Sequence, residues 1–126
     1  MIIVVVEDLL FLSKIQQTAQ QVSIPIEAVD PAKVEERARA TSAKAIIVDL
    51  NNRSGSAVEL VRTLKAHSAT RGIPVTGFLS HVQADLAAAA HAAGCDRVLA
   101  RSALTRELPE LLKALEHGAP IAIEGA

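Results

Sequence analysis

The chain has 126 residues, with 13 basic and 14 acidic side chains and a formal net charge of −1 at pH 7. Half of the residues are hydrophobic and 21% are charged, which indicates one compact domain and excludes a disordered chain. The balanced charge, the two phenylalanines and the lack of Trp and Tyr argue against a nucleic-acid partner.

The cysteine content and the apolar runs bear on the cellular compartment. The single cysteine, Cys95, excludes an internal disulfide and a cysteine-based zinc site, and a reducing compartment is the simplest interpretation. No apolar run approaches the roughly 18–20 residues that a membrane span needs. The first apolar run has no basic region before it and is interrupted by Glu7 and Asp8, unlike a secretory signal peptide. We therefore expect a cytoplasmic protein with no membrane partner.

The first half of the chain alternates between two hydropathy patterns. Short continuous runs of apolar, mostly β-branched residues are typical of strands buried on both faces of a parallel sheet. Longer stretches with apolar residues three or four apart are typical of helices that cover such a sheet. Asp30 before Pro31 indicates a helix N-cap and the first helical position. In chain order we expect a strand at 2–6, a helix at 9–22, a strand at 26–29, a helix from 31 to about 40, and a strand at 45–48.

The second half repeats this alternation after a polar loop at residues 51–56, which contains Gly55. Gly94 is typical of the left-handed residue that closes a helix. Thr105 is expected to cap the last helix, so Pro109 would lie within about its first turn, where proline costs least. In chain order we expect a helix at 58–67, a strand at 75–79, a helix at 83–93, a strand at 97–100 and a helix from 105 to about 116.

Strands that alternate with helices predict an α/β fold, with a five-stranded parallel sheet doubly wound by helices on both faces. Right-handed crossovers should connect the strands. We expect residues 1–117 to form one domain and residues 118–126 a partly disordered tail, with no output domain after it. In sheets of this kind, ligands bind beyond the carboxyl ends of the strands, so functional residues should directly follow the strands.

Acidic residues follow two of these strands. Glu7 and Asp8 come after the first strand, and Asp49 comes after the third. Clustered carboxylates repel one another, and oxygen ligands of this kind suit Mg²⁺. A carboxylate beside such a cation can attack phosphorus and form an aspartyl phosphate. Taken singly, however, Asp8 could cap the helix that follows it, and Asp49 could be a turn residue.

A hydroxyl and a guanidinium are expected at the same edge of the sheet. Ser80 follows the fourth strand and Arg101 follows the fifth. Arg101 could also be a solvated surface charge. At these positions the sequence resembles the receiver domain of bacterial response regulators, of the chemotaxis-regulator type. The resemblance spans residues 2 to about 115 and is carried by Glu7-Asp8, by Ala45 to Asp49, by Val58-Glu59-Leu60-Val61, by Ile73-Pro74-Val75, and by Ala92-Ala93-Gly94-Cys95-Asp96.

The resemblance implies a flavodoxin-like (βα)₅ fold with strand order 2-1-3-4-5. It implies that Asp49 is the phosphoacceptor, and that Glu7, Asp8, Asp49 and the backbone carbonyl of Asn51 hold Mg²⁺. Arg101 and Ser80 would contact the phosphoryl group. The chain would be a phosphoprotein of a two-component regulatory system, a stand-alone response regulator without enzymatic activity. It would receive its phosphoryl group in a phosphorelay from a histidine kinase or a phosphotransfer protein.

Output is expected at the face made by the fourth helix, the fifth strand and the fifth helix. This face would include Ala87, Ala88, His91 and Val98, and would contact a separate output protein. Small side chains allow close helix approach, so a stripe on the fourth helix could also support a homodimer; it comprises Ala84, Ala87, Ala88 and His91. The alternative for this stripe is that it packs on the sheet.

Several positions depart from the family's pattern. Arg101 stands where the family has a lysine, and Ser102 where it has a cis proline. Val98 takes the place of the switch aromatic, and Arg53 that of a loop proline. Gap-free counting puts Leu79, one residue before Ser80, at the switch hydroxyl.

These departures leave two further hypotheses open. The chain could be a pseudo-receiver, a phosphorylation-independent protein–protein interaction module in which Arg101 neutralises the carboxylates permanently, for example through a bidentate pair with Asp49. It could also be a small enzyme that hydrolyses phosphate esters. The sequence offers no dedicated general base for that reaction.

Overall fold

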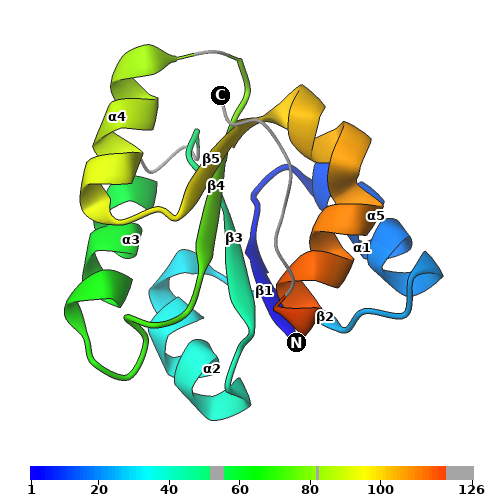
Figure 1. Ribbon diagram of the computed structural model, residues 1–126, viewed down its shortest axis with the longest axis horizontal. Helices are drawn as coiled ribbons and strands as arrows, with labels where there is room; N and C mark the ends of the chain where they lie inside the picture. The colour runs from blue at the N-terminus through cyan, green and yellow to red at the C-terminus, as the bar shows by residue number, and fades with distance from the viewer. Residues whose placement is uncertain (52–55, 82, 119–126) are drawn as a thin grey trace.

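The computed structural model describes residues 1–51, 56–81 and 83–118. These residues form one five-stranded parallel sheet with the order β2-β1-β3-β4-β5, and helices cover both of its faces (Figure 1). This architecture confirms the predicted doubly wound (βα)₅ fold. The strands are β1 (Ile2–Val5), β2 (Ile26–Ala28), β3 (Ala45–Asp49), β4 (Val75–Leu79) and β5 (Arg97–Ala100). The helices are α1 (Leu9–Gln21), the 3₁₀ turn η1 (Pro31–Lys33), α2 (Val34–Thr41), α3 (Ala57–Ala66), α4 (Ala84–Ala93) and α5 (Arg101–His117).

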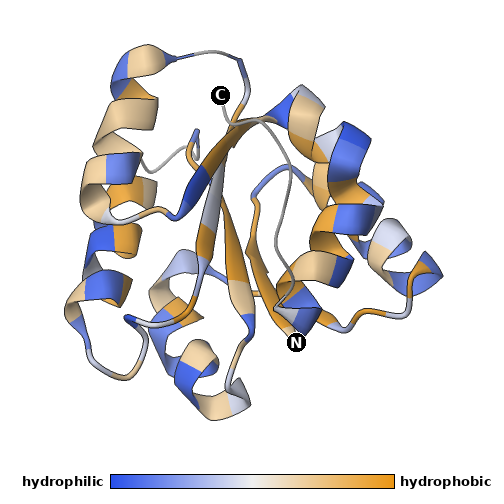
Figure 2. Ribbon diagram, in the orientation of Figure 1, coloured by the Kyte–Doolittle hydropathy of each residue, from blue (hydrophilic) through white to orange (hydrophobic). Residues whose placement is uncertain are grey.

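The sheet divides the hydrophobic core into two clusters, one under each layer of helices. Side chains alternate along a strand, so Ile46 and Val48 of β3 pack toward α2, α3 and α4, whereas Ala45 and Ile47 pack toward α1 and α5. All five residues of β3 are buried. The strands are accordingly apolar along most of their length in Figure 2. This double burial explains the continuous apolar runs, and it leaves polar residues to the strand ends.

Helix α5 begins earlier than the sequence predicts. Its N-cap position is Ala100, at the end of β5, and the predicted cap Thr105 lies within the helix. Pro109 therefore lies inside the helix and not in its first turn, so that prediction was wrong. Leu104 explains the difference: it is completely buried and extends the apolar stripe that continues through Leu108. Burial of this stripe outweighs the local capping preference of a threonine.

Smaller differences concern the segment after β2. The single predicted helix from Pro31 is divided into the 3₁₀ turn η1 and helix α2. Asp30 holds the N-cap position of η1, but its side chain makes no capping hydrogen bond to the described residues.

Gly94 closes α4 with a φ of +118°, as predicted. Cys95 is buried, and its burial raises the pKa of the thiol to about 11.

Some predictions fall on parts of the chain outside the described ranges. These are the loop residues Arg53 and Gly55 and the tail after Gly118. Within the described ranges, no helix is both long enough and apolar enough to span a bilayer.

Candidate functional site

The carboxyl ends of β1, β3, β4 and β5 surround one hollow of about 580 Å³. Parallel strands end at the same edge of a sheet, which brings residues distant in sequence together. The hollow is lined by Glu7, Asp8, Leu9, Leu10, Asp49, Asn51, Ser80 and Arg101. The structure thus places every residue of the predicted phosphoryl and metal site in one place, although their roles stay predictions.

Asp8 is the N-cap of α1. Its Oδ1 accepts hydrogen bonds from the backbone N–H groups of Leu10 at 3.0 Å and Phe11 at 3.2 Å. Its Oδ2 accepts a hydrogen bond from Arg101 Nη1 at 3.3 Å. The backbone N–H of Phe11 and the Arg101 guanidinium both favour the ionised form and lower the pKa of Asp8. Both oxygens of this carboxylate therefore already have partners within the chain.

Asp49 ends β3 and is the most buried acid of the site, with 5% of its surface exposed. Its Oδ1 accepts a hydrogen bond from the backbone N–H of Asn51 at 2.9 Å. Arg101 Nη2 lies 4.0 Å from its Oδ2. Burial raises the pKa of Asp49, and the Asn51 N–H and the Arg101 charge only partly oppose this effect. Ionised Asp49 is therefore less favourable in the folded protein than in water.

Arg101 is the first residue of α5, and its guanidinium lies between the carboxylates and two aromatic rings. Its Cζ is 4.5 Å from the centroid of Phe11 and 5.7 Å from that of Phe78. It does not form the bidentate pair with Asp49 that the pseudo-receiver hypothesis suggested, because its hydrogen bond goes to Asp8. Its Nε is buried and has no hydrogen-bond partner among the described residues.

Ser80, and not Leu79, faces the hollow. Leu79 is completely buried in the core, whereas Ser80 is exposed. The backbone N–H of Ser80 donates to Asn51 Oδ1 at 2.7 Å. The ends of β3 and β4 are thus connected at the rim of the site. The described peptide bonds, including that between Arg101 and Ser102, are all trans.

The side chains in this arrangement do not fit Mg²⁺. Among the described residues, no group of three or more His, Cys, Asp or Glu side chains is placed to hold a metal ion. Three of the four oxygens of Asp8 and Asp49 accept hydrogen bonds from Arg101 or from backbone N–H groups. A cation could share both carboxylates only if Arg101 moved away from Asp8.

Comparisons with known proteins agree with this architecture. No family model and no curated protein matches the sequence. Solved structures do match. The chemotaxis response regulator CheY4 of Vibrio cholerae has a TM-score of 0.77 and 16% identity, over 90% of this chain and 96% of that one. A putative response regulator of Chloroflexus aurantiacus has a TM-score of 0.79 and 15% identity, over 90% and 94%. The Mn²⁺-bound form of response regulator Rcp1 has a TM-score of 0.66 and 17% identity, over 99% and 98%.

The chain has the receiver-domain fold. At identities this low the likeness concerns the fold alone, and function must be argued from the site.

In a receiver fold, the expected output face contains the fifth strand. Val98, however, is only 1% exposed and lies in the core, so its predicted place on that face was wrong. β5 is an edge strand of the sheet, but helices cover both of its faces, so Val98 and Leu99 are buried in the two core clusters.

Helix α4 of this receiver fold exposes most of the predicted stripe, whereas Ala87 is half-buried and packs against the core. Ala84, Ala88 and His91 are exposed, whereas Ala90 and Ala93 provide the buried contacts. The alternative that the stripe packs on the sheet therefore does not hold for these three residues.

Sequence reasoning missed the two aromatic residues of the site. Phe11 and Phe78 follow the apolar periodicity of α1 and β4, which is typical of core residues and gives no sign of a site, and both are buried. Their rarity was the one sign in the sequence that they could have a special role, because they are the only two aromatic residues among Phe, Trp and Tyr in the chain. It also missed Leu9 and Leu10, which are 77% and 86% exposed at the rim.

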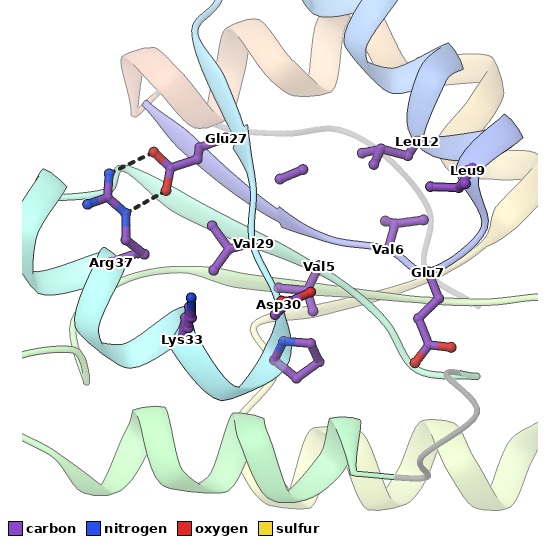
Figure 3. A pocket seen from close by; sticks show the side chains of 12 residues that line it. Val5, Val6, Glu7, Leu9, Leu12, Glu27, Val29, Asp30, Lys33 and Arg37 are labelled. Atoms are coloured by element: carbon purple, nitrogen blue, oxygen red, sulfur yellow. Dashed lines mark hydrogen bonds and ion pairs between the residues drawn. The ribbon is translucent and has the colours of Figure 1, made fainter.

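A second hollow of about 550 Å³ adjoins the acidic site (Figure 3). It lies beside β2, between α1 and α2, and Glu7 lines both hollows. Arg37 forms a bidentate ion pair with Glu27, with Nε–Oε2 at 2.6 Å and Nη2–Oε1 at 2.8 Å (Figure 3). The Arg37–Glu27 pair shows the hydrogen-bond distances of a guanidinium that a carboxylate holds by itself, and Arg101 can be compared with it.

Proposed function

We propose that this chain is a receiver-like module of two-component signalling that acts through protein–protein contact, without enzymatic activity and independently of phosphorylation. One observation carries the proposal. The Arg101 guanidinium donates to Asp8 at 3.3 Å and lies 4.0 Å from Asp49, between the carboxylates that would otherwise need a metal ion. Arg101 is part of the chain, so this neutralisation is permanent.

The position of Arg101 supports a state that does not switch. A phosphoryl group on Asp49 would bring negative charge beside Glu7 and Asp8, which normally requires a divalent cation. Such a cation must first displace Arg101 from Asp8. Val98 is buried in the core, and as a valine it lacks the aromatic ring that stands at the switch position of the family. These features favour one stable conformation that a partner protein recognises.

A second candidate function is acceptance of a phosphoryl group by Asp49 with Mg²⁺, as the resemblance implies. Two observations support it. Asp49, Asn51, Ser80 and Arg101 line the same hollow, and the similar response regulator Rcp1 has a Mn²⁺-bound form. In this case the partner would be a histidine kinase or a phosphotransfer protein. The output partner, a possible homodimer and the cytoplasmic location stay predictions under both candidates.

Intact-mass spectrometry after incubation with a small phosphodonor and Mg²⁺ separates the two candidates. We expect no adduct on the wild type, and none on the Asp49→Ala control. We expect Arg101→Lys to bind Mg²⁺ more tightly, because the compact ammonium does not stack on the rings. A labile phosphoryl mass on the wild type that is absent in Asp49→Ala would replace the first proposal with the second.

A further inference from the structure

We infer that Phe11 and Phe78 are positioning residues, which hold the Arg101 guanidinium over the carboxylates and so set the selectivity of the site against divalent cations. This inference rests on the proposed function, since it explains how Arg101 keeps its place. It assigns a role to the only two aromatic residues of the chain.

The geometry is that of a guanidinium against two aromatic faces. Arg101 Cζ lies 4.5 Å from the centroid of Phe11 and 5.7 Å from that of Phe78, both within the roughly 6 Å range of cation–π attraction. The rings contact each other, with centroids 5.2 Å apart and planes inclined by 54°. Phe11 is 7% exposed, Phe78 is fully buried and the Arg101 side chain is 31% exposed, so the cation and the rings are partly desolvated.

The carboxylates alone do not explain where the guanidinium lies. Arg37 contacts Glu27 through two hydrogen bonds of 2.6 and 2.8 Å. Arg101, in contrast, donates to Asp8 at 3.3 Å and lies 4.0 Å from Asp49, and its Nε has no hydrogen-bond partner among the described residues. Such a loosely paired cation needs another source of attraction, and the negative faces of the two rings supply it.

Backbone structure places each ring beside one carboxylate. The backbone N–H of Phe11 donates to Asp8 Oδ1 at 3.2 Å, so the cap of α1 fixes both residues together. Phe78 is the direct neighbour of Asp49 in the parallel pairing of β3 and β4. The rings and the carboxylates are thus preorganised as one unit, into which the first residue of α5 inserts.

Selectivity follows from competition for the same carboxylates. A divalent cation that binds Asp8 and Asp49 together must displace Arg101, and it then loses the ring contacts as well as the ion pair. Weaker ring attraction should therefore allow tighter metal binding. For a partly desolvated pair, we expect the effect to be about threefold to tenfold in affinity.

The sequence allows this to be tested with only a small change in the volume of the core. Biosynthetic replacement of phenylalanine by 3,4,5-trifluorophenylalanine alters only Phe11 and Phe78, and it weakens the negative faces of their rings. We expect a Mg²⁺ titration followed by NMR to show about threefold to tenfold tighter binding to the fluorinated protein. We also expect the Arg101 Nε–H resonance to lose part of its ring-current shift. Phe11→Leu should act in the same direction.

An Arg101→Met protein, with and without fluorination, is the matched control. Fluorination should leave its Mg²⁺ affinity unchanged. An equal change in both backgrounds, or no change in the wild-type background, would overturn the inference. If Arg101→Met binds Mg²⁺ no better than the wild type, the proposed function fails instead, and the Arg101 Nε–H shift still reports whether the rings hold the guanidinium.

Discussion

The two ends of the sheet each hold a cationic side chain against oxygen acceptors, but in different ways. At the amino end, Lys65 Nζ of α3 donates to Ile73 O at 2.9 Å, to Asp96 Oδ2 at 3.0 Å and to Arg71 O at 3.3 Å. Asp96 Oδ2 also accepts the backbone N–H of Val75 at 2.7 Å. Every donor of this ammonium group therefore has an acceptor.

At the carboxyl end, the partners of Arg101 that the structure describes are Asp8 at 3.3 Å and Asp49 at 4.0 Å. Its Nε is unpaired among the described residues, and the nearby Asp49 carboxylate has a raised pKa because it is buried. A cluster such as that of Lys65, in which every donor has an acceptor, stabilises the fold. An incompletely paired cation beside a carboxylate of raised pKa, at the edge where ligands bind, is typical of a functional site. The contrast predicts that substitutions at the amino end lower stability and that some at the carboxyl end raise it.

The largest expected loss of stability is at Gly94, whose backbone packs against the side chain of Lys65. Gly94 has a φ of +118°, and a Cβ there would lie 2.6 Å from Lys65 Cγ. We expect Gly94→Ala to lower the free energy of unfolding by about 3 kcal/mol, measured by urea denaturation. Gly72→Ala is the control, because its Cβ would meet no described atom within 4 Å. Equal effects of the two substitutions would show that the packing at Gly94 is not what matters.

The next effect concerns the ammonium group itself. Lys65→Met keeps the apolar stem of the side chain but removes the donor that Asp96 and two carbonyl oxygens share. We expect a loss of about 2 kcal/mol in the free energy of unfolding. Lys113→Met removes an exposed pair with Glu110, with Nζ 3.7 Å from Oε1, and should change stability by less than about 0.5 kcal/mol. A comparable loss in both variants would remove the distinction between a saturated cluster and a surface pair.

A gain in stability is expected at the carboxyl end. Because the folded-state pKa of Asp49 is raised, its ionisation costs stability as the pH rises through that value. Asp49→Asn keeps an acceptor for Asn51 N–H and removes the buried charge, so we expect a gain on the order of 1 kcal/mol at pH 7. The gain should disappear below the ordinary Asp pKa of 3.8, as thermal unfolding at both pH values would show. A destabilised variant at pH 7 would mean that Arg101 outweighs the burial of this carboxylate.

The smallest effect is expected at Asp8, and it has the opposite sign. Its pKa is lowered, so it contributes stability above its unfolded pKa, which is lost as the pH falls through the folded value. Asp8→Asn keeps the cap of α1 and removes only the charge. We expect a slightly lower Tm at pH 7 and no difference in strong acid. Asp30→Asn is the control, and a similar loss there would assign the effect to the helix ends and not to Arg101.

Much of the architecture was predictable, since local rules and burial agree along most of the chain. Continuous apolar runs predicted strands covered on both faces, and β3 is entirely buried. The gathering of Asp8 and Asp49 was also predictable, because parallel strands end at one edge. The start of α5 was not, because the burial of Leu104 by the sheet overrides the capping preference of Thr105.

By itself, the sequence determined the alternation of strands and helices, and with it the side of the sheet on which the acidic residues meet. Only the tertiary structure decided that Arg101 donates to Asp8, which lies 93 positions away, and stacks on Phe11. Hydropathy periodicity depends on neighbours a few residues apart, and it therefore specifies which face of an element is buried. The position of one long charged side chain depends on contacts from α1, β3 and β4 together, which no local pattern contains.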